Sequence, residues 1–368
     1  MEPFKNWLNP KVAEQIAMAI KRNQKSFDQL SFLKNINKEL ENLELKERVH
    51  FLSEKLHAHL PKNQQKATVL LVGALKRNDQ DQVGLSGVAL WPLTHYISIY
   101  GLEYFDQSME ALKEMTKLFT SEFAVRAFFL QDQKRFLKII KEWMKDDNEH
   151  VRRLVSEGLR PLLPWGVKLE AVARDPMITW GILDALKNDP SEYVRKSVAN
   201  HINDHTKNHP EFVIEKLMQW HLSEKKTKEV DWVIRHGSRS LIKKGYLKSF
   251  VFHGVEGQLI EVGQQKILTK KVNLGESLKV RLVVENKSHK IATVILDHEI
   301  YLLKKNKSHT IKIFKGKKIK LAANQSCQLE LKIPLKAVTT RVYYPGRHYW
   351  NVKINGVNQT RLPFELVM

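Results

Sequence analysis

The 368-residue sequence contains one cysteine and no long hydrophobic run. Cys327 cannot form a disulfide within the chain, which fits a reducing cytoplasm. Apolar runs such as Ala67–Leu75 are far shorter than the roughly 20 residues of a membrane-spanning helix. The segment Met1–Ile20 carries acidic residues and lacks the continuous apolar core of a secretion signal. We therefore expect a soluble cytoplasmic protein that does not associate with a membrane.

Acidic residues are also scarce relative to basic ones. The chain has 61 Lys and Arg against 40 Asp and Glu, a net charge of +21. Residues 252–368 hold 21 Lys and Arg but only 8 Asp and Glu. Such an excess favours a polyanionic partner, and nucleic acid is the first candidate, because neutralised phosphates release bound counterions. Solubility through surface lysines is the simpler alternative. A glycine-rich phosphate loop is absent, which argues against an NTPase.

The apolar pattern changes near Phe250. Before this point apolar residues recur at helical spacing, and after it short alternating runs are separated by turn-like stretches. The expected strands cover 278–284, 291–295, 310–314, 329–333 and 350–354. We predict a multidomain α + β protein, with an all-α region over residues 1–250 and an immunoglobulin-like β-sandwich of about seven strands over residues 252–368.

The helical region repeats itself. Val-Arg or Val-x-Arg motifs recur, and Val151, Val194 and Val233 are 43 and 39 residues apart. This spacing is typical of the helix pairs of HEAT-like repeats, although the 26 residues between Val125 and Val151 make the array irregular. Residues 1–250 are therefore expected to form an α-solenoid with a concave face that could bind a DNA duplex.

The most informative stretch is Val151–Trp165. Gly158 and the two prolines that follow are expected to end a helix, so Glu157 falls in its last turn, where the helix dipole disfavours a negative charge. A carboxylate placed there indicates function, and an ion pair with Arg153 at i,i+4 is the structural alternative. Trp165 follows two prolines and would be rigidly placed, either for function or as a core tryptophan.

Two further acids occupy comparable places in neighbouring repeats. Glu122 opens the preceding repeat, and Asp204 lies late in the helix that begins near Tyr193. Each acid alone is more typical of a helix cap or a surface position. If Glu122, Glu157 and Asp204 converge, their mutual repulsion costs stability, and a cationic ligand or transition state would account for the cluster.

The strings SEFAVRAFF, NEHVRRLVSEG, RPLLPW, YVRKSVANHINDHTKNHP and RHGSRSLIKKG follow one another in this order. Together they resemble the AlkC branch of the HEAT-like-repeat DNA alkylation repair glycosylases, over most of residues 115–245. The segment Tyr343–Val357 resembles the immunoglobulin-like domain that some members append. One departure is Leu162, where the family often has a basic residue.

The resemblance implies hydrolysis of the N-glycosidic bond of N3-methylated bases, chiefly 3-methyladenine and 3-methylcytosine. It also implies that Glu122, Glu157 and Asp204 are active-site acids, that Trp165 is an active-site tryptophan, and that the base is not flipped out of the DNA. An N3-alkylated base already carries a positive charge and leaves without protonation. The acids would then stabilise the sugar cation and position water.

We expect double-stranded DNA with alkylated bases as the partner, a monomer with no obligate protein partner, and neither a cofactor nor a metal. The residues predicted to contact DNA are Arg152, Arg160, Lys243, Lys244, Lys315, Lys317 and Lys318. All but Arg160 have a structural alternative: Arg152, like other arginines at helix starts of such repeats, often makes contacts within the array, lysines favour helix C-termini, and edge lysines discourage aggregation.

Two other functions remain open. A non-catalytic HEAT-repeat scaffold that binds DNA or protein would need no acid cluster. A metalloenzyme is the second, because His201, Asp204, His205 and His209 lie close in sequence. The HExxH motif requires a glutamate after its first histidine, and this chain has Ile202 there.

Overall fold

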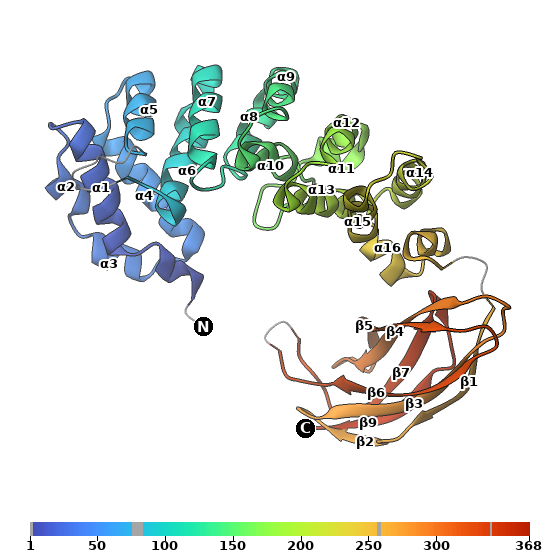
Figure 1. Ribbon diagram of the computed structural model, residues 1–368. Helices are drawn as coiled ribbons and strands as arrows, with labels where there is room; N and C mark the ends of the chain where they lie inside the picture. The colour runs from blue at the N-terminus through green and yellow to red at the C-terminus, as the bar shows by residue number, and fades with distance from the viewer. Residues whose placement is uncertain (1–2, 76–83, 256–258, 339–340) are drawn as a thin grey trace. The chain divides into compact units, whose positions relative to one another are not determined.

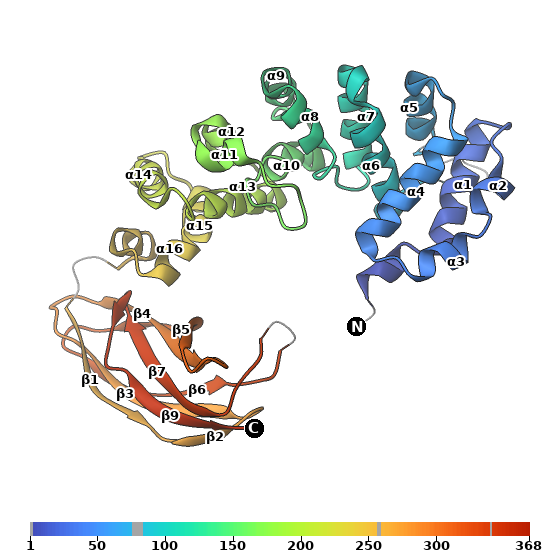
Figure 2. The same ribbon diagram turned by 180° about the vertical axis from the view of Figure 1, so that it is seen from behind.

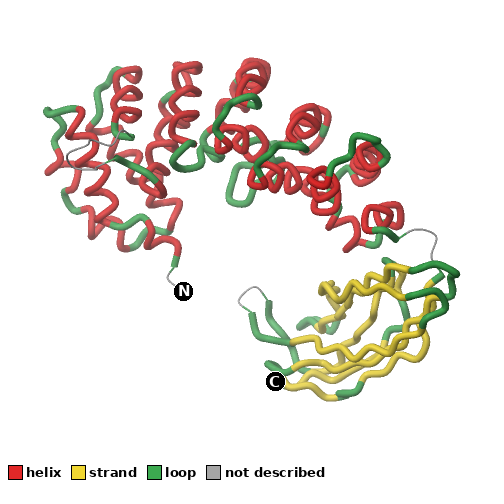
Figure 3. Tube along the Cα trace, in the orientation of Figure 1, coloured by secondary structure: helices red, strands yellow, loops and turns green. Residues whose placement is uncertain are grey.

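The computed structural model describes residues 3–75, 84–255, 259–338 and 341–368. The chain divides into two compact units, Met1–Asn208 and His209–Met368, which are described separately below. The described residues of the first unit form only helices and loops, and the second unit joins helices to strands (Figure 3). The predicted multidomain α + β class, with HEAT-like helical repeats followed by an immunoglobulin-like sandwich, is confirmed.

The helices of the first unit are short and follow one another closely. None of the helices in the described ranges is long and apolar enough to cross a membrane. The helices of this unit are η1 (Phe4–Trp7), α1 (Pro10–Asn23), α2 (Gln29–Leu33), α3 (Ile36–Glu41), α4 (Leu45–His59), α5 (Gln64–Gly73), η2 (Gly87–Leu90), α6 (Trp91–Tyr100), η3 (Leu102–Tyr104), α7 (Phe105–Thr116), α8 (Val125–Gln131), α9 (Gln133–Trp143), α10 (Glu149–Glu157), α11 (Glu170–Arg174), α12 (Met177–Leu186) and α13 (Glu192–His205).

These helices pair and stack in two rows. One row contains α5, α7, α9 and α12, and the other contains α4, α6, α10 and α13, as Figures 1 and 2 show from opposite sides. Helix α4 contacts α6, and α10 contacts α13. Each helix buries one apolar face against its neighbours, which is the arrangement expected of HEAT-like repeats.

Helix α10 shows how local sequence sets the ends of an element. Asn148 caps its N-terminus by accepting a hydrogen bond from the backbone N–H of His150. The helix ends at Glu157, as predicted. The next residue is Gly158, and a side chain is excluded at this position because a Cβ would come within 2.7 Å of Val125 Cγ2 on α8. Val151 and its apolar neighbours one turn on are buried, and this face packs against α13.

The second unit begins with helices and continues with strands. Its elements are α14 (Pro210–His221), α15 (Lys228–Gly237), α16 (Arg239–Lys244), η4 (Leu247–His253), β1 (Ile260–Ile267), β2 (Lys271–Asn273), β3 (Ser277–Asn286), β4 (Ala292–Leu303), β5 (His309–Leu321), β6 (Ser326–Pro334), β7 (Gly346–Ile354), β8 (Val357–Asn358) and β9 (Leu362–Val367). The change from helix to strand therefore falls between His253 and Ile260. The compact units divide earlier, after Asn208, so α14–η4 belong with the strands.

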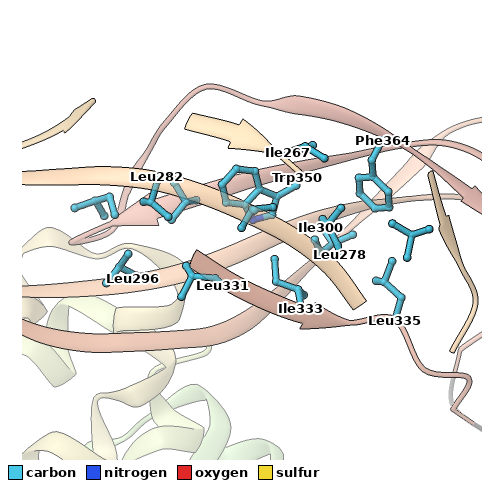
Figure 4. Close-up of a cluster of buried hydrophobic side chains, with 14 of the residues drawn as sticks. Ile267, Leu278, Leu282, Leu296, Ile300, Leu331, Ile333, Leu335, Trp350 and Phe364 are labelled. Atoms are coloured by element: carbon cyan, nitrogen blue, oxygen red, sulfur yellow. The ribbon is translucent and has the colours of Figure 1, made fainter. Parts of the chain in front are cut away.

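The strands form two facing sheets. One has the order β1-β3-β6, and the other has the order β2-β9-β7-β4-β5, with β8 paired to β7. All pairings are antiparallel except β2 with β9. Side chains from both sheets meet in a buried cluster around the fully enclosed Trp350 (Figure 4). The five expected strand segments correspond to β3–β7, and the others are β1, β9 and the short β2 and β8.

Candidate active site

The loop after α10 is held in place by a buried arginine. Arg126 of α8 donates from Nη1 to the carbonyl oxygens of Gly158 and Arg160, at 2.8 and 2.9 Å, and from Nε to Val167 O at 2.8 Å. Its side chain is 1% exposed, and burial lowers the pKa of its guanidinium to about 10. Arg126 therefore satisfies carbonyls at the end of α10 and anchors the loop that carries Arg160 and Trp165.

Glu157 and Asp204 are joined by one arginine. Arg160 Nη1 lies 2.7 Å from Glu157 Oε1, and its Nε lies 3.0 Å from Asp204 Oδ2. Ser197 of α13 donates to Glu157 Oε2 at 2.6 Å, and Lys207 Nζ lies 3.7 Å from Asp204 Oδ1. Burial lowers the pKa of Arg160, but Glu157 and Asp204 outweigh it and raise that pKa. The packing of α10 on α13 thus brings together two carboxylates that are 47 positions apart in sequence.

Glu122 joins the same network through a second arginine. Arg153 Nη1 donates to Glu122 Oε2, and Arg153 Nη2 lies 3.4 Å from Glu157 Oε1. Thr120 Oγ1 also donates to Glu122, at 2.9 Å. The guanidinium of Arg153 lies over the ring of Tyr193, 5.2 Å from its centre. The Arg153–Glu157 pair anticipated as a structural alternative is therefore present.

We call Glu122, Arg153, Glu157, Arg160 and Asp204 the acid network. The three acids are 9%, 6% and 4% exposed, in chain order, so they converge in a largely buried site. Their cationic partners are the protein's own arginines, together with Lys207. The sequence argument that such a cluster needs a cationic ligand or transition state is therefore wrong for the isolated chain, because intramolecular ion pairs already offset the repulsion.

Trp165 lies apart from the core. Its side chain is 57% exposed, so it is not a core tryptophan, and its backbone has a φ of 64°, in the left-handed region that is unusual for a bulky residue. The ammonium of Lys46 donates to Trp165 O. The Trp165 ring contacts Phe4 edge to face, with centroids 6.1 Å apart. The structure therefore places Trp165 on an exposed loop beside η1 and α4.

The histidines considered as metal ligands have other roles. His201 Nδ1 lies 3.0 Å from Ser156 O, so this nitrogen carries the proton. The other nitrogen of His201 and the Nε2 of His205 both contact Thr179 Oγ1, at 3.2 and 3.1 Å. Within the described residues no group of three or more His, Cys, Asp or Glu side chains could hold a metal ion. His201 thus links the last turn of α10 to α13 and α12.

The residues predicted to bind DNA fall into two groups. Arg152 forms a two-point ion pair with Asp189, at 2.7 and 2.9 Å, and Arg160 belongs to the acid network. Both guanidinium groups form ion pairs within the protein, which the structural alternative anticipated for Arg152 but not for Arg160. Lys243, Lys315, Lys317 and Lys318 are exposed and surround one cavity of about 470 Å³ in the second unit, and Lys244 is exposed at the end of α16. Contact of any of these residues with DNA stays a prediction.

Sequence reasoning missed three participants. Arg160 was predicted only to contact DNA, whereas its guanidinium bridges Glu157 and Asp204. Ser197 lies seven positions before Asp204 on α13, two helical turns away, so a search for polar residues on the same helix face could have found it. Phe4 left no signal, because nothing in the sequence relates it to Trp165.

Comparisons with known proteins can now be set beside this geometry. A family model described as DNA alkylation repair enzyme matches residues 102–241, and one described as the C-terminal Ig-like domain of uncharacterised protein YhaZ matches residues 261–368. The chain is 35% identical to Pseudomonas fluorescens alkylpurine DNA glycosylase AlkC, solved bound to DNA containing an abasic site analog, with a TM-score of 0.91 and 100% of both chains covered. It is 33% identical over 368 residues to the uncharacterized protein YhaZ of Bacillus subtilis (strain 168), again with 100% of both chains covered.

Proposed function

This chain belongs to the AlkC branch of the DNA alkylation repair enzymes, and on that premise we propose that it is a DNA N-glycosylase that releases cationic N3-alkylated bases. The match to the DNA alkylation repair model spans the whole acid network. The similar AlkC protein is an alkylpurine DNA glycosylase. For the present chain we propose 3-methyladenine and 3-methylcytosine in double-stranded DNA as substrates.

The single observation that carries this proposal is the convergence of three carboxylates from successive repeats in one hydrogen-bonded network. Glu122 precedes α8, Glu157 ends α10 and Asp204 lies in the last turn of α13. Oriented carboxylates are suited to stabilising positive charge that develops on a sugar. The resemblance in sequence assigns these same three acids to the active site.

The proposed reaction needs no general acid. The C1′–N bond breaks, and its electron pair leaves with the base, which cancels the positive charge of the alkylated ring. A water oxygen bonds to C1′, and its proton passes to a carboxylate, for which we propose Glu157 or Asp204. Arg153 and Arg160 act as positioning residues, because their ion pairs fix the direction of the three carboxylates.

We propose that the cavity lined by Lys243, Lys315, Lys317 and Lys318 contacts the DNA backbone. Four ammonium groups around one cavity form a concentration of positive charge that phosphates would neutralise. Arg152 and Arg160 are weaker candidates because their guanidinium groups already have carboxylate partners. We also propose a monomeric state and a cytoplasmic location, as expected from the sequence.

A non-catalytic HEAT-repeat scaffold is the second candidate. One observation favours it: each of the three acids already has a cationic partner within the protein, as in a network that serves only stability. The two functions differ in what the carboxylates do to bound DNA.

Base release from duplex DNA containing 3-methyladenine separates them. Glu157→Gln keeps the shape of the side chain and removes its charge. We expect it to retain DNA binding and to slow base release by about 100-fold or more, since loss of one preorganised electrostatic group typically costs that much. Glu142→Gln, an exposed acid paired with Lys145, is the matched control and should release base at the wild-type rate. Absence of base release by the wild-type protein, or equal rates for Glu157→Gln and wild type, would reject the glycosylase.

A further inference from the structure

The two acids proposed to accept the proton of water differ in how firmly their oxygens are held. Both oxygens of Glu157 are hydrogen-bonded, Oε1 to Arg160 at 2.7 Å and Oε2 to Ser197 at 2.6 Å. Among the described side chains only Arg160 donates a hydrogen bond to Asp204, from Nε to Oδ2 at 3.0 Å. The other oxygen of Asp204, Oδ1, lies 3.7 Å from Lys207 Nζ, which is beyond hydrogen-bond distance. Asp204 Oδ1 is therefore the oxygen that is more readily uncovered.

Lys207 lies at the boundary between the buried acid network and solvent. Its side chain is 47% exposed, whereas that of Asp204 is 4% exposed. Lys207 follows the end of α13, and its backbone N–H donates to Asp204 O at 3.2 Å. A lysine at this place also interacts favourably with the helix dipole, so a purely structural role is the alternative. Its ammonium is carried on a flexible four-carbon stem and can leave Asp204 while the backbone stays in place.

A DNA phosphate is suited to taking Lys207 from Asp204. An ion pair with a solvent-exposed partner typically contributes little to stability. A phosphate offers the ammonium several charge-assisted hydrogen bonds, and its neutralisation releases counterions. Each sugar of a DNA strand lies between two phosphates, so a sugar that reaches Asp204 brings phosphates close to Lys207.

We propose that Lys207 is a positioning residue that pairs with Asp204 in the free protein and binds a phosphate of the lesion strand in the DNA complex. The exchange uncovers Asp204 Oδ1 when the sugar arrives, while Arg160 keeps Oδ2 in place. The negative charge of the carboxylate then acts on the sugar cation instead of on the lysine. This inference rests on the proposed function, and it adds a residue that is not among those predicted from sequence to contact DNA.

The salt dependence of binding to a duplex with a tetrahydrofuran abasic analogue tests the phosphate contact. Lys207→Gln should reduce the slope of log K against log salt by about 0.9, the value for one phosphate, and Lys207→Arg should keep the wild-type slope. Lys187→Gln is the matched control, because Lys187 forms the same i,i+3 ion pair with Asp184 at the end of α12, outside the acid network. It should leave the slope unchanged. A wild-type slope for Lys207→Gln would leave this lysine only its role at the helix end and overturn the proposal.

A double-mutant cycle on the same duplex tests the exchange of partners. Asp204→Asn removes the ion pair that DNA has to break, so it should tighten binding about two- to fivefold more in the wild-type background than in the Lys207→Gln background. Glu157→Gln removes the same charge from the acid network, and its effect on binding should be equal in both backgrounds because Glu157 does not pair with Lys207. Equal effects of Asp204→Asn in both backgrounds would overturn the exchange.

The binding measurements require no catalysis, so this proposal and the glycosylase can fail separately. Base release by the wild-type protein tests the glycosylase, and coupling between Lys207 and Asp204 without base release would reject only catalysis. Thermal melting of each variant shows whether the fold is retained. The Lys207 variants change an exposed side chain, so the salt dependence decides the proposal even if Asp204→Asn does not fold.

Discussion

At the scale of single residues, two arginines determine how the acid network holds together. Arg153 lies between Glu122 and Glu157, and Arg160 lies between Glu157 and Asp204. A buried carboxylate is strongly destabilising without a partner, so each arginine offsets the desolvation of two acids. The same contacts point the carboxylates in set directions, which a catalytic site requires and a random surface cluster does not provide.

Replacement of Arg160 by methionine tests this balance. Arg160→Met keeps the apolar stem of the side chain but leaves Glu157 and Asp204 without their shared cation. We expect a loss of about 3–5 kcal/mol in the free energy of unfolding, measured by urea denaturation, because breaking a buried pair leaves an uncompensated charge. The control Arg135→Met removes an exposed pair with Asp106 and should leave the unfolding midpoint unchanged. Equal effects of the two changes would contradict the prediction.

His201 makes stability depend on pH. Burial lowers the pKa of its imidazole well below 6.5, and His205 adds to the shift. In the unfolded chain His201 binds a proton as the pH falls through about 6.5, whereas in the folded chain it stays neutral. The contribution of His201 to the free energy of unfolding is therefore fully present above about pH 6.5 and declines as the pH falls. Urea unfolding at about pH 7.5 and 5 should show a smaller decline for His201→Gln than for wild type. An identical decline in both proteins would show that other groups control it.

At the scale of elements, the end of α10 depends on close approach to α8. The residue after the last turn is Gly158, because a Cβ at this position would collide with Val125 of α8. Arg126, also on α8, donates to the buried carbonyls of Gly158 and Arg160. The second half of the site depends on α13, which presents Ser197, His201 and Asp204 toward α10. Two helix contacts therefore set the geometry of the candidate site.

Two glycines with opposite surroundings test the contact between α8 and α10. In Gly158→Ala the added Cβ would lie 2.7 Å from Val125 Cγ2 and 3.0 Å from Leu154 O, and such overpacking costs about 1–3 kcal/mol. In Gly181→Ala, on α12, a Cβ meets nothing within 4 Å, and alanine should stabilise the helix by about 0.5–1 kcal/mol. Thermal or urea unfolding should therefore show shifts of opposite sign, and shifts of the same sign would contradict this account.

At the scale of the whole molecule, charge is distributed unevenly. Residues 252–368 hold 21 of the 61 Lys and Arg but only 8 of the 40 Asp and Glu, whereas the acid network lies in the first unit. The proposed phosphate contacts require positive charge, whereas the proposed action of the acids on a sugar cation requires negative charge. Their separation along the chain allows both in one protein.

The salt dependence of DNA binding measures how much the cavity lysines contribute to the affinity for DNA. If Lys315 and Lys317 each neutralise one phosphate, Lys315→Ala and Lys317→Ala should each reduce the slope of log K against log salt by about 0.9. Lys279→Ala, on the exposed face of β3, removes the same charge outside the cavity and should leave the slope unchanged. Equal slopes for all three variants and wild type would remove the cavity from the DNA contact.

The amino-acid sequence by itself determined the order of helices and strands and the ends of key elements. Apolar periodicity and capping residues act over a few neighbouring positions, so the end of α10 at Glu157 and five of the strands could be predicted without tertiary information. The family resemblance rests on short sequence strings, and it predicted Glu122, Glu157 and Asp204 as active-site acids.

Only the tertiary structure decided which charged and aromatic groups meet. Glu157 and Asp204 share Arg160 because α10 packs on α13, and Phe4 reaches Trp165 because η1 and the loop after α10 lie side by side. Side-chain contacts across such distances in the sequence depend on helix packing and on burial of a common core. Periodicity along one helix contains no information about the partner helix, and therefore could not reveal that the acids are already paired.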